Sequence, residues 1–181
     1  LKLAFRGILM ATFAVEAIGA LLIFISLPSG NDRWFEALFL SISAFCNAGF
    51  ATYANNLVDI RGCELAVWTI ASLIVIGGLG YTVLFEIGYR VAQTIRRKKP
   101  TPLVWSLNAR VVLRYSFILV FGGAAALSIA GTDRANGLVA SLWHTLFQSI
   151  SARTAGFNTL NIGAMPVTAL MVLIGLMYIG G

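Results

Sequence analysis

Charge is scarce in this 181-residue chain. Charged residues make up 11% of it and hydrophobic residues 59%, whereas soluble domains carry roughly 25% charged residues. With only two cysteines, Cys46 and Cys63, it also lacks a disulfide framework. The motifs Gly-x-Ser-x-Gly, His-Glu-x-x-His, Cys-x-x-Cys and the P-loop are all missing, and the few carboxylates form no pair for acid–base work. These absences argue against a soluble domain and against an enzyme.

Long apolar stretches take the place of charge. A membrane span needs about 20 mostly apolar residues, and four stretches predict spans: Gly7–Pro28, Leu65–Glu86, Tyr115–Gly131 and Pro166–Gly181. A secretory signal is the alternative for the first, but its apolar part exceeds the roughly 7–15 residues of such signals. Because the last stretch stops within an apolar run and the chain starts at Leu1, we expect a fragment of a longer multi-pass membrane protein.

Basic residues gather on one side of these spans. The group comprises Lys2, Arg6, Arg90, Arg96, Arg97, Lys98, Lys99, Arg110 and Arg114. By the positive-inside rule this side, with the linker Arg96–Pro102, is cytoplasmic. The net charge of +6 therefore indicates topology rather than nucleic-acid binding.

One short segment occurs twice. Ser41–Phe50 (SISAFCNAGF) returns as Ser149–Phe157 (SISARTAGF), each copy after a short amphipathic segment, Trp34–Phe45 or Leu138–Ala152. These half-helices are too short to cross about 30 Å of hydrocarbon. The sequence thus predicts an all-α polytopic membrane protein of tandem span–pore helix–filter loop–span repeats. The first repeat covers residues 1–100 and the second, truncated, residues 101–181.

Each copy of the segment ends in a loop suited to cations. The C-terminal end of a half-helix is partially negative, and loop carbonyls at membrane depth can replace the hydration shell of a cation. Gly49 and Gly156 are the expected pivots of the loops, because glycine readily adopts the positive φ that turns carbonyls inward. With the basic side cytoplasmic, both loops enter from outside.

These motifs resemble filter segments of the Trk/Ktr/HKT cation-transporter superfamily, most closely bacterial KtrB-like and TrkH-like potassium uptake subunits. The resemblance implies four channel-like repeats around one pore, of which this chain is the second and most of the third. It implies K⁺-binding carbonyls at Asn47, Ala48, Gly49, Thr154, Ala155 and Gly156. Cys46 departs from the family pattern, where asparagine is common. The first and fourth loops, and a gating stretch after Gly181, are absent from this chain.

The resemblance also implies partners and a cargo. K⁺ is the transported ion, with Na⁺ as a candidate co-ion and no other metal or cofactor. The expected partners are membrane lipid, the two further repeats of the same chain, a cytosolic nucleotide-binding regulatory subunit and a second copy in a homodimer; none is a nucleic acid. The expected location is the plasma membrane. Two alternatives stay open: a Na⁺ or mixed Na⁺/K⁺ transporter of the same fold, and a non-conducting scaffold subunit.

Two alternative roles are considered for several individual residues. Arg153 is interpreted as a cap of the half-helix, with tuning of ion occupancy as the alternative. Glu16, near the bilayer middle, should pair with a neighbouring helix or face the pore, because an isolated charge there is unfavourable. Gly77, Gly78 and Gly80 are expected to permit close helix packing, with a hinge as the alternative. His144 has no ligand cluster around it, and the run Arg96–Lys99 suits lipid headgroups.

Overall fold

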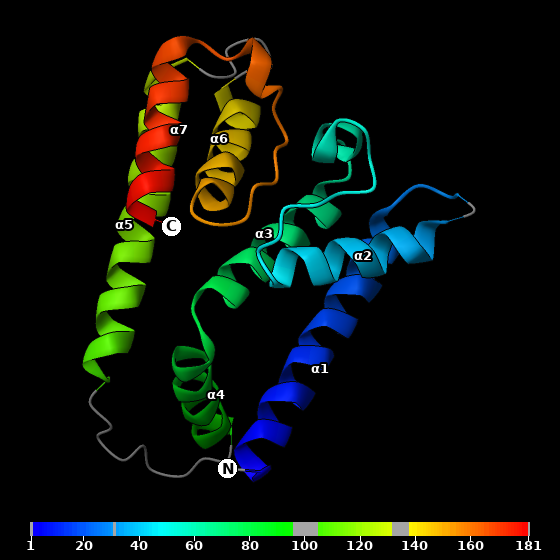
Figure 1. Ribbon diagram of the computed structural model, residues 1–181, viewed down its shortest axis with the longest axis vertical. Coiled ribbons are helices and arrows are strands. Elements are labelled where there is room, and N and C mark those ends of the chain that lie inside the picture. The colour runs from blue at the N-terminus through cyan, green and yellow to red at the C-terminus, as the bar shows by residue number, and fades with distance from the viewer. Residues whose placement is uncertain (1, 31, 96–104, 132–137, 181) are drawn as a thin grey trace.

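The computed structural model describes residues 2–30, 32–95, 105–131 and 138–180 (Figure 1). Regular structure in these ranges is entirely helical, which confirms the prediction of an all-α chain. The helices, in chain order, are α1 (Lys2–Ser26), α2 (Arg33–Phe45), η1 (Asn56–Ile60), α3 (Glu64–Gly78), α4 (Tyr81–Ile95), α5 (Leu107–Ile129), α6 (Leu138–Ala152), η3 (Ile162–Ala164) and α7 (Val167–Gly180).

Two helices have the length and composition to cross a membrane. Arg6–Ser26 within α1 and Leu107–Ile129 in α5 span 21 and 23 residues with mean hydropathies of 2.4 and 1.8. Both begin at the lower end of the molecule in Figure 1. Helix α5 starts earlier than the expected Tyr115 because Ser106 caps it: the Ser106 hydroxyl accepts a hydrogen bond from the Ala109 amide at 3.1 Å. The fourth predicted span corresponds to the shorter apolar helix α7.

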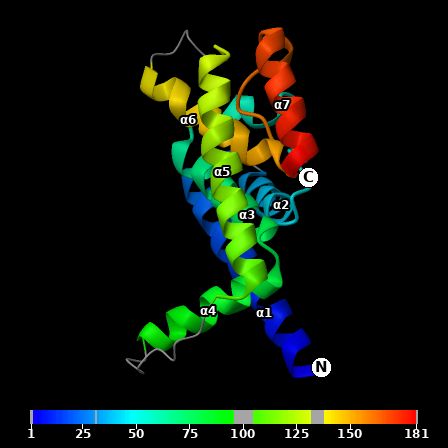
Figure 2. The same cartoon turned by 90° about the vertical axis from the view of Figure 1, so that its left-hand side faces the viewer.

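The span predicted over Leu65–Glu86 is a pair of helices with a sharp bend between them, and not one continuous helix. Helix α3 ends at Gly78, and α4 departs from it at an angle of 104°. The cause is Gly80, which has a φ of +76°, a conformation that glycine adopts without steric cost. No atom lies within 4 Å of the position its Cβ would take, so Gly80 serves the bend and not the close packing expected of it. Figure 2 shows α4 running across the direction of α5.

Helices α2 and α6 are the two predicted half-helices, and we call them the short helices, although α3, α4 and α7 are of similar length. Helix α2 has 13 residues and α6 has 15, so they measure about 20 and 22 Å at 1.5 Å per residue. Helix α2 packs against α1 and α3, and α6 packs against α5 and α7. The predicted half-helices are therefore present as helices shorter than the hydrocarbon core.

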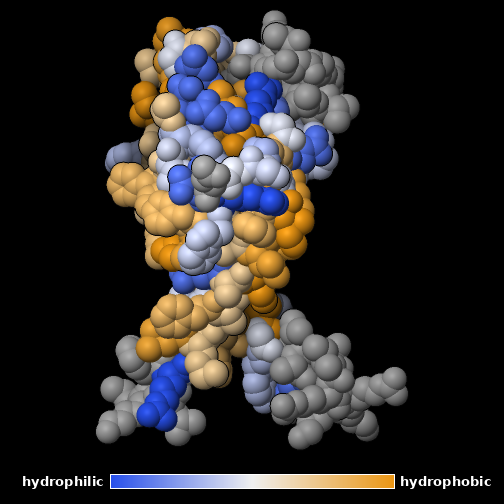
Figure 3. All heavy atoms as spheres, turned by 90° about the vertical axis from the view of Figure 1, so that its right-hand side faces the viewer, coloured by the Kyte–Doolittle hydropathy of each residue, from blue (hydrophilic) through white to orange (hydrophobic). Residues whose placement is uncertain are grey.

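A shared core holds the two halves of the chain together. One buried cluster combines residues from both, among them Ile23, Leu40, Ile70, Phe147, Ile150 and Phe157. Across the same boundary the rings of Trp68 and Trp143 meet edge to face, with centroids 4.9 Å apart. Figure 3 shows hydrophobic residues over much of the middle and lower body, with hydrophilic residues gathered toward the top. This exposed apolar surface suits a protein surrounded by lipid or by further membrane helices.

Candidate functional site: two glycine loops in contact

The segments that follow α2 and α6 touch one another. We call Cys46–Phe50 and Arg153–Phe157 the first and second glycine loops. Gly49 and Gly156 have φ values of +74° and +80°, which confirms the positive φ predicted for both. A Cβ on Gly49 would collide with the carbonyl oxygen of Ala155, whereas one on Gly156 would lie 3.7 Å from the Gly49 Cα. Glycine is therefore required at Gly49 by space as well as by backbone conformation.

A serine hydroxyl holds each glycine loop. The Ser43 hydroxyl donates to the Phe50 carbonyl at 2.8 Å, and the Ser151 hydroxyl donates to the Phe157 carbonyl at 2.5 Å. Each bond joins the last turns of a short helix to the residue directly after the glycine. The loop is thereby turned back toward its own helix, and the duplicated Ser-Ile-Ser sequence has the same role in both copies.

The first serine of each copy fastens the short helix to a long one. The Ser41 hydroxyl donates to the backbone carbonyl of Glu16 at 2.7 Å, and the Ser149 hydroxyl donates to that of Val120 at 2.8 Å. A glycine on each long helix makes room for this contact, since a Cβ there would press on the serine oxygen; these glycines are Gly19 and Gly123. Both short helices are thus docked by the same set of contacts.

The helices after the glycine loops pack closely against the loop ends. A Cβ on Gly77 of α3 would collide with the Phe45 carbonyl oxygen, and one on Gly180 of α7 would lie 3.0 Å from Cγ of Arg153. Close packing, predicted for Gly77, is confirmed. The Asn47 amide reinforces it in the orientation that satisfies both partners: it donates to Ile74 O at 3.3 Å and accepts from Gly78 N at 3.2 Å.

Several main-chain carbonyl oxygens of the two glycine loops have no hydrogen-bond partner among the described residues. Of the six residues predicted to bind K⁺, five have a main-chain carbonyl that accepts no hydrogen bond within the part of the chain that the structure describes: Asn47, Ala48, Thr154, Ala155 and Gly156. The sixth carbonyl, that of Gly49, accepts from the Asn56 side chain at 3.2 Å. Asn47 is half-buried and Ala155 is buried, whereas Ala48, Thr154 and Gly156 are exposed. These carbonyl oxygens are therefore candidates for an outside partner such as water or a cation.

The structure also shows the surroundings of the other residues singled out in the sequence. Arg153 follows α6 directly, and its Nε has no hydrogen-bond partner among the described residues. Glu16 is 8% exposed and its carbonyl receives the Ser41 bond. His144 accepts a hydrogen bond from Nε of Arg61 at 2.7 Å. Cys46 and Cys63 are free thiols. The run Arg96–Lys99 lies outside the described residues.

One residue was not anticipated from the sequence. Asn56, at the start of η1, contacts both glycine-loop segments through its side chain. The repeat could not reveal it, because the second copy reaches its 3₁₀ helix through a different stretch of chain. An Asn-Asn pair shortly after a glycine loop was the available signal, since asparagine tolerates left-handed backbone and favours turns.

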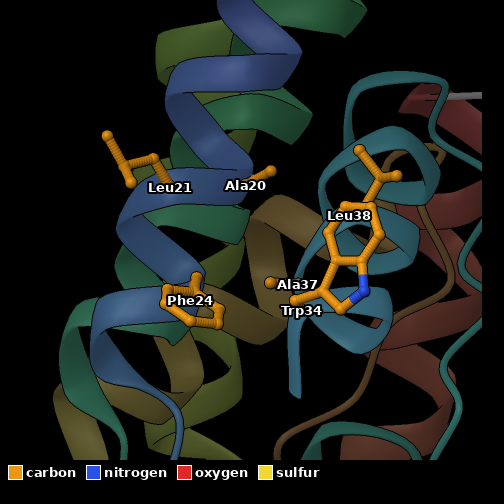
Figure 4. Close-up of a pocket in the computed structure, with 6 residues that line it drawn as sticks. All are labelled: Ala20, Leu21, Phe24, Trp34, Ala37 and Leu38. Atoms are coloured by element: carbon orange, nitrogen blue, oxygen red, sulfur yellow. The ribbon is translucent and has the colours of Figure 1, made fainter. Parts of the chain in front are cut away.

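A groove among the described residues, apart from the glycine loops, offers nothing to a cation. It has a volume of about 290 Å³ and lies between α1 and α2 (Figure 4). Its lining is apolar except for the indole N–H of Trp34, a donor that cannot ligate a cation; the residues are Ala20, Leu21, Phe24, Trp34, Ala37 and Leu38. This groove is therefore not a candidate for the ion site.

The fold and the glycine loops define a helical membrane protein in which one set of contacts, from long helix to short helix to loop, is made twice. A family model described as cation transport protein, TrkH, matches residues 2–181. The chain therefore belongs to the TrkH family of cation transport proteins, a family of transporters rather than of enzymes.

Curated relatives agree with this assignment. The chain is 31% identical to Ktr system potassium uptake protein B of Bacillus subtilis and 30% identical to the protein of that name in Vibrio alginolyticus, over 97% and 94% of its length. It is 32% identical to potassium/sodium uptake protein NtpJ of Enterococcus hirae, over 96% of its length. These alignments cover 39%, 38% and 38% of the relatives, so the chain spans about two fifths of their length.

Proposed function

We propose that this chain supplies two of the filter loops of a pore for K⁺ uptake. The observation that carries the proposal is the contact between the two glycine loops, where five carbonyl oxygens have no partner among the described residues. The family match and the names of the Ktr relatives support K⁺ as the cargo.

The proposed mechanism is dehydration followed by coordination. K⁺ leaves its hydration shell at Asn47–Gly49 and Thr154–Gly156, where backbone carbonyls substitute for water. The C-terminal ends of α2 and α6 point into the same region and favour positive charge there. Arg153 at the end of α6 caps that helix in this scheme. Two loops provide half a coordination ring, so two further loops from the rest of the protein complete it, and the electrochemical gradient drives uptake.

A mixed-ion transporter is the second candidate. The relative named potassium/sodium uptake protein is 32% identical to this chain, as similar as the relatives named for potassium alone. Competition between K⁺ and Na⁺ for uptake discriminates the two candidates. A non-conducting scaffold differs from both, because its ion flux would be unchanged by any substitution in the glycine loops.

The surroundings proposed for the pore follow the charge pattern. We place the basic side, including Arg96–Lys99, in the cytoplasm, and the entry to the glycine loops on the outer face of the plasma membrane. A cytosolic nucleotide-binding regulatory subunit and a second copy in a homodimer are the proposed partners. No enzymatic activity is proposed.

The test is K⁺ uptake by the natural full-length protein in cells that lack their own K⁺ systems. Gly49→Ser and Gly156→Ser should each weaken K⁺ affinity or K⁺/Na⁺ discrimination at a normal amount of protein in the membrane. If both variants take up K⁺ with unchanged affinity and selectivity, the glycine loops only pack the protein and the proposed mechanism is wrong.

A further inference from the structure

Asn56 joins the two glycine-loop segments. Its Nδ2 donates to the carbonyl oxygen of Gly49 at 3.2 Å, and its Oδ1 accepts from the backbone amide of Asn158 at 3.3 Å. Gly49 is the glycine of the first loop, and Asn158 follows directly on the second. One amide group therefore spans the boundary between two parts of the chain that are about 100 residues apart.

The geometry of Asn56 is specific to its residue type. Its φ is +57°, in the left-handed region where asparagine is several-fold enriched among non-glycine residues. Its Oδ1 also accepts from the Leu57 amide at 2.9 Å, which fixes the side chain relative to its own backbone. Leu57, fully buried, anchors the segment in the core. Only a side-chain amide, with donors and an acceptor on one planar group, makes all of these bonds from this place.

The bond to Gly49 sets the direction of one particular carbonyl. Gly49 is the only one of the six predicted K⁺-binding residues whose main-chain carbonyl has a hydrogen-bond donor among the described residues. A carbonyl oxygen has two lone pairs, so the bond leaves one for a cation. The Gly156 carbonyl has no such donor in the described chain. The two loops are therefore held by the same serine contacts, but the Gly49 carbonyl has a restraint that the Gly156 carbonyl lacks among the described residues.

We propose that Asn56 is a positioning residue for ion selectivity: its side-chain amide fixes the Gly49 carbonyl and the spacing between the two glycine loops, and so helps the filter to distinguish K⁺ from Na⁺. This inference rests on the proposed function. Selectivity depends on the distance and number of the coordinating carbonyls, and a loop freed at Gly49 can close around the smaller ion. Asn56 acts through the carbonyl and need not touch the ion.

The experiment measures Rb⁺ and K⁺ uptake by the full-length protein, with KM, maximal rate, inhibition by Na⁺ and the amount of protein in the membrane determined together. Asn56→Gly removes all three side-chain bonds, to Gly49, Asn158 and Leu57, and keeps the left-handed backbone free of strain. Asn56→Asp keeps the acceptor and loses the donor to Gly49. Asn55→Ala is the matched control, because Asn55 is adjacent and exposed and its side chain bonds to Asp59 rather than to a glycine loop.

Both Asn56 variants should raise KM for K⁺ and lower the K⁺/Na⁺ ratio by about tenfold, equivalent to about 1.4 kcal/mol, with maximal rate per transporter within about twofold. Asn55→Ala should match the wild type. If the Asn56 variants lose rate only in proportion to their amount in the membrane, or match Asn55→Ala in KM and selectivity, the inference is wrong.

A second comparison separates this failure from that of the proposed function. If Gly156→Ser impairs K⁺ affinity or selectivity while the Asn56 variants do not, only the role of Asn56 is overturned. If the wild-type protein takes up no K⁺, or Gly156→Ser changes neither quantity, the proposed function itself fails.

Discussion

Replacing Gly49 or Gly156 by alanine should have unequal effects, although the two glycines occupy matching positions in the duplicated segment. Both occupy positive φ, and an alanine in that conformation costs about 1–2 kcal/mol. For Gly156→Ala this strain is the main effect, because the new Cβ would lie at an ordinary 3.7 Å from the Gly49 Cα. We expect K⁺ affinity to fall by about 5- to 30-fold.

Gly49→Ala adds a collision to the same strain. Its Cβ would strike the Ala155 carbonyl oxygen, which is backbone and cannot move aside as a flexible side chain would. One loop must shift against the other, so the loss of affinity should exceed that of Gly156→Ala by at least about tenfold, or transport should vanish. The assay is Rb⁺ uptake with Na⁺ competition in the full-length protein, and Gly62→Ala, with open space around its Cβ, is the control. Equal effects of the two loop variants would refute the contact between the loops.

Three further predictions concern the framework of the site. Ser43→Ala and Ser151→Ala each remove one hydrogen bond to a loop carbonyl, worth about 1 kcal/mol; the K⁺/Na⁺ uptake ratio should fall about fivefold, and an unchanged ratio in both would contradict the role of these serines. Gly77→Ala would push a Cβ against the Phe45 carbonyl, so the thermal midpoint of the purified protein should fall by several degrees, whereas a midpoint equal to that of wild type would contradict the packing. Gly80→Ala places an alanine at positive φ in the bend between α3 and α4, which should destabilise the protein by about 1–2 kcal/mol and lower the yield of folded protein. Gly88→Ala, in open space within α4, should leave the yield unchanged.

Hydrophobicity and the repeat predicted most of the fold. An apolar run of about 20 residues has few alternatives to a membrane helix, so α1 and α5 fall close to their expected places. The bounds of α6 agree with the prediction, because the duplicated segment locates its end. The bend between α3 and α4 was not predicted, because hydropathy is continuous there and the break depends on the φ of a single residue, Gly80. Glycine is common in membrane helices, so the sequence does not distinguish a packing glycine from a bending one.

The two glycines of the candidate site could be predicted from the sequence, but the hydrogen bonds of Asn56 to the loop segments could not. Gly49 and Gly156 stand out because a duplicated glycine between apolar runs indicates a backbone conformation that other residues avoid. Asn56 gives no such signal, since its partners are main-chain atoms that could belong to any residue type. Its role depends on η1 folding back over the first glycine loop while the second lies alongside, which is a property of the packed structure.

The two glycine loops are held by the same serine hydrogen bonds and differ in the contacts made by Asn56. The contacts that dock each short helix recur at corresponding places, from Ser41 and Ser149 to Ser43 and Ser151. Duplication of a segment accounts for this part, because the same residues in the same order make the same bonds. Asn56 has no such counterpart, because the Gly156 carbonyl has no hydrogen-bond donor among the described residues. The ring of the proposed filter is therefore not symmetric, and we expect its selectivity to depend on contacts between loops as well as on each loop alone.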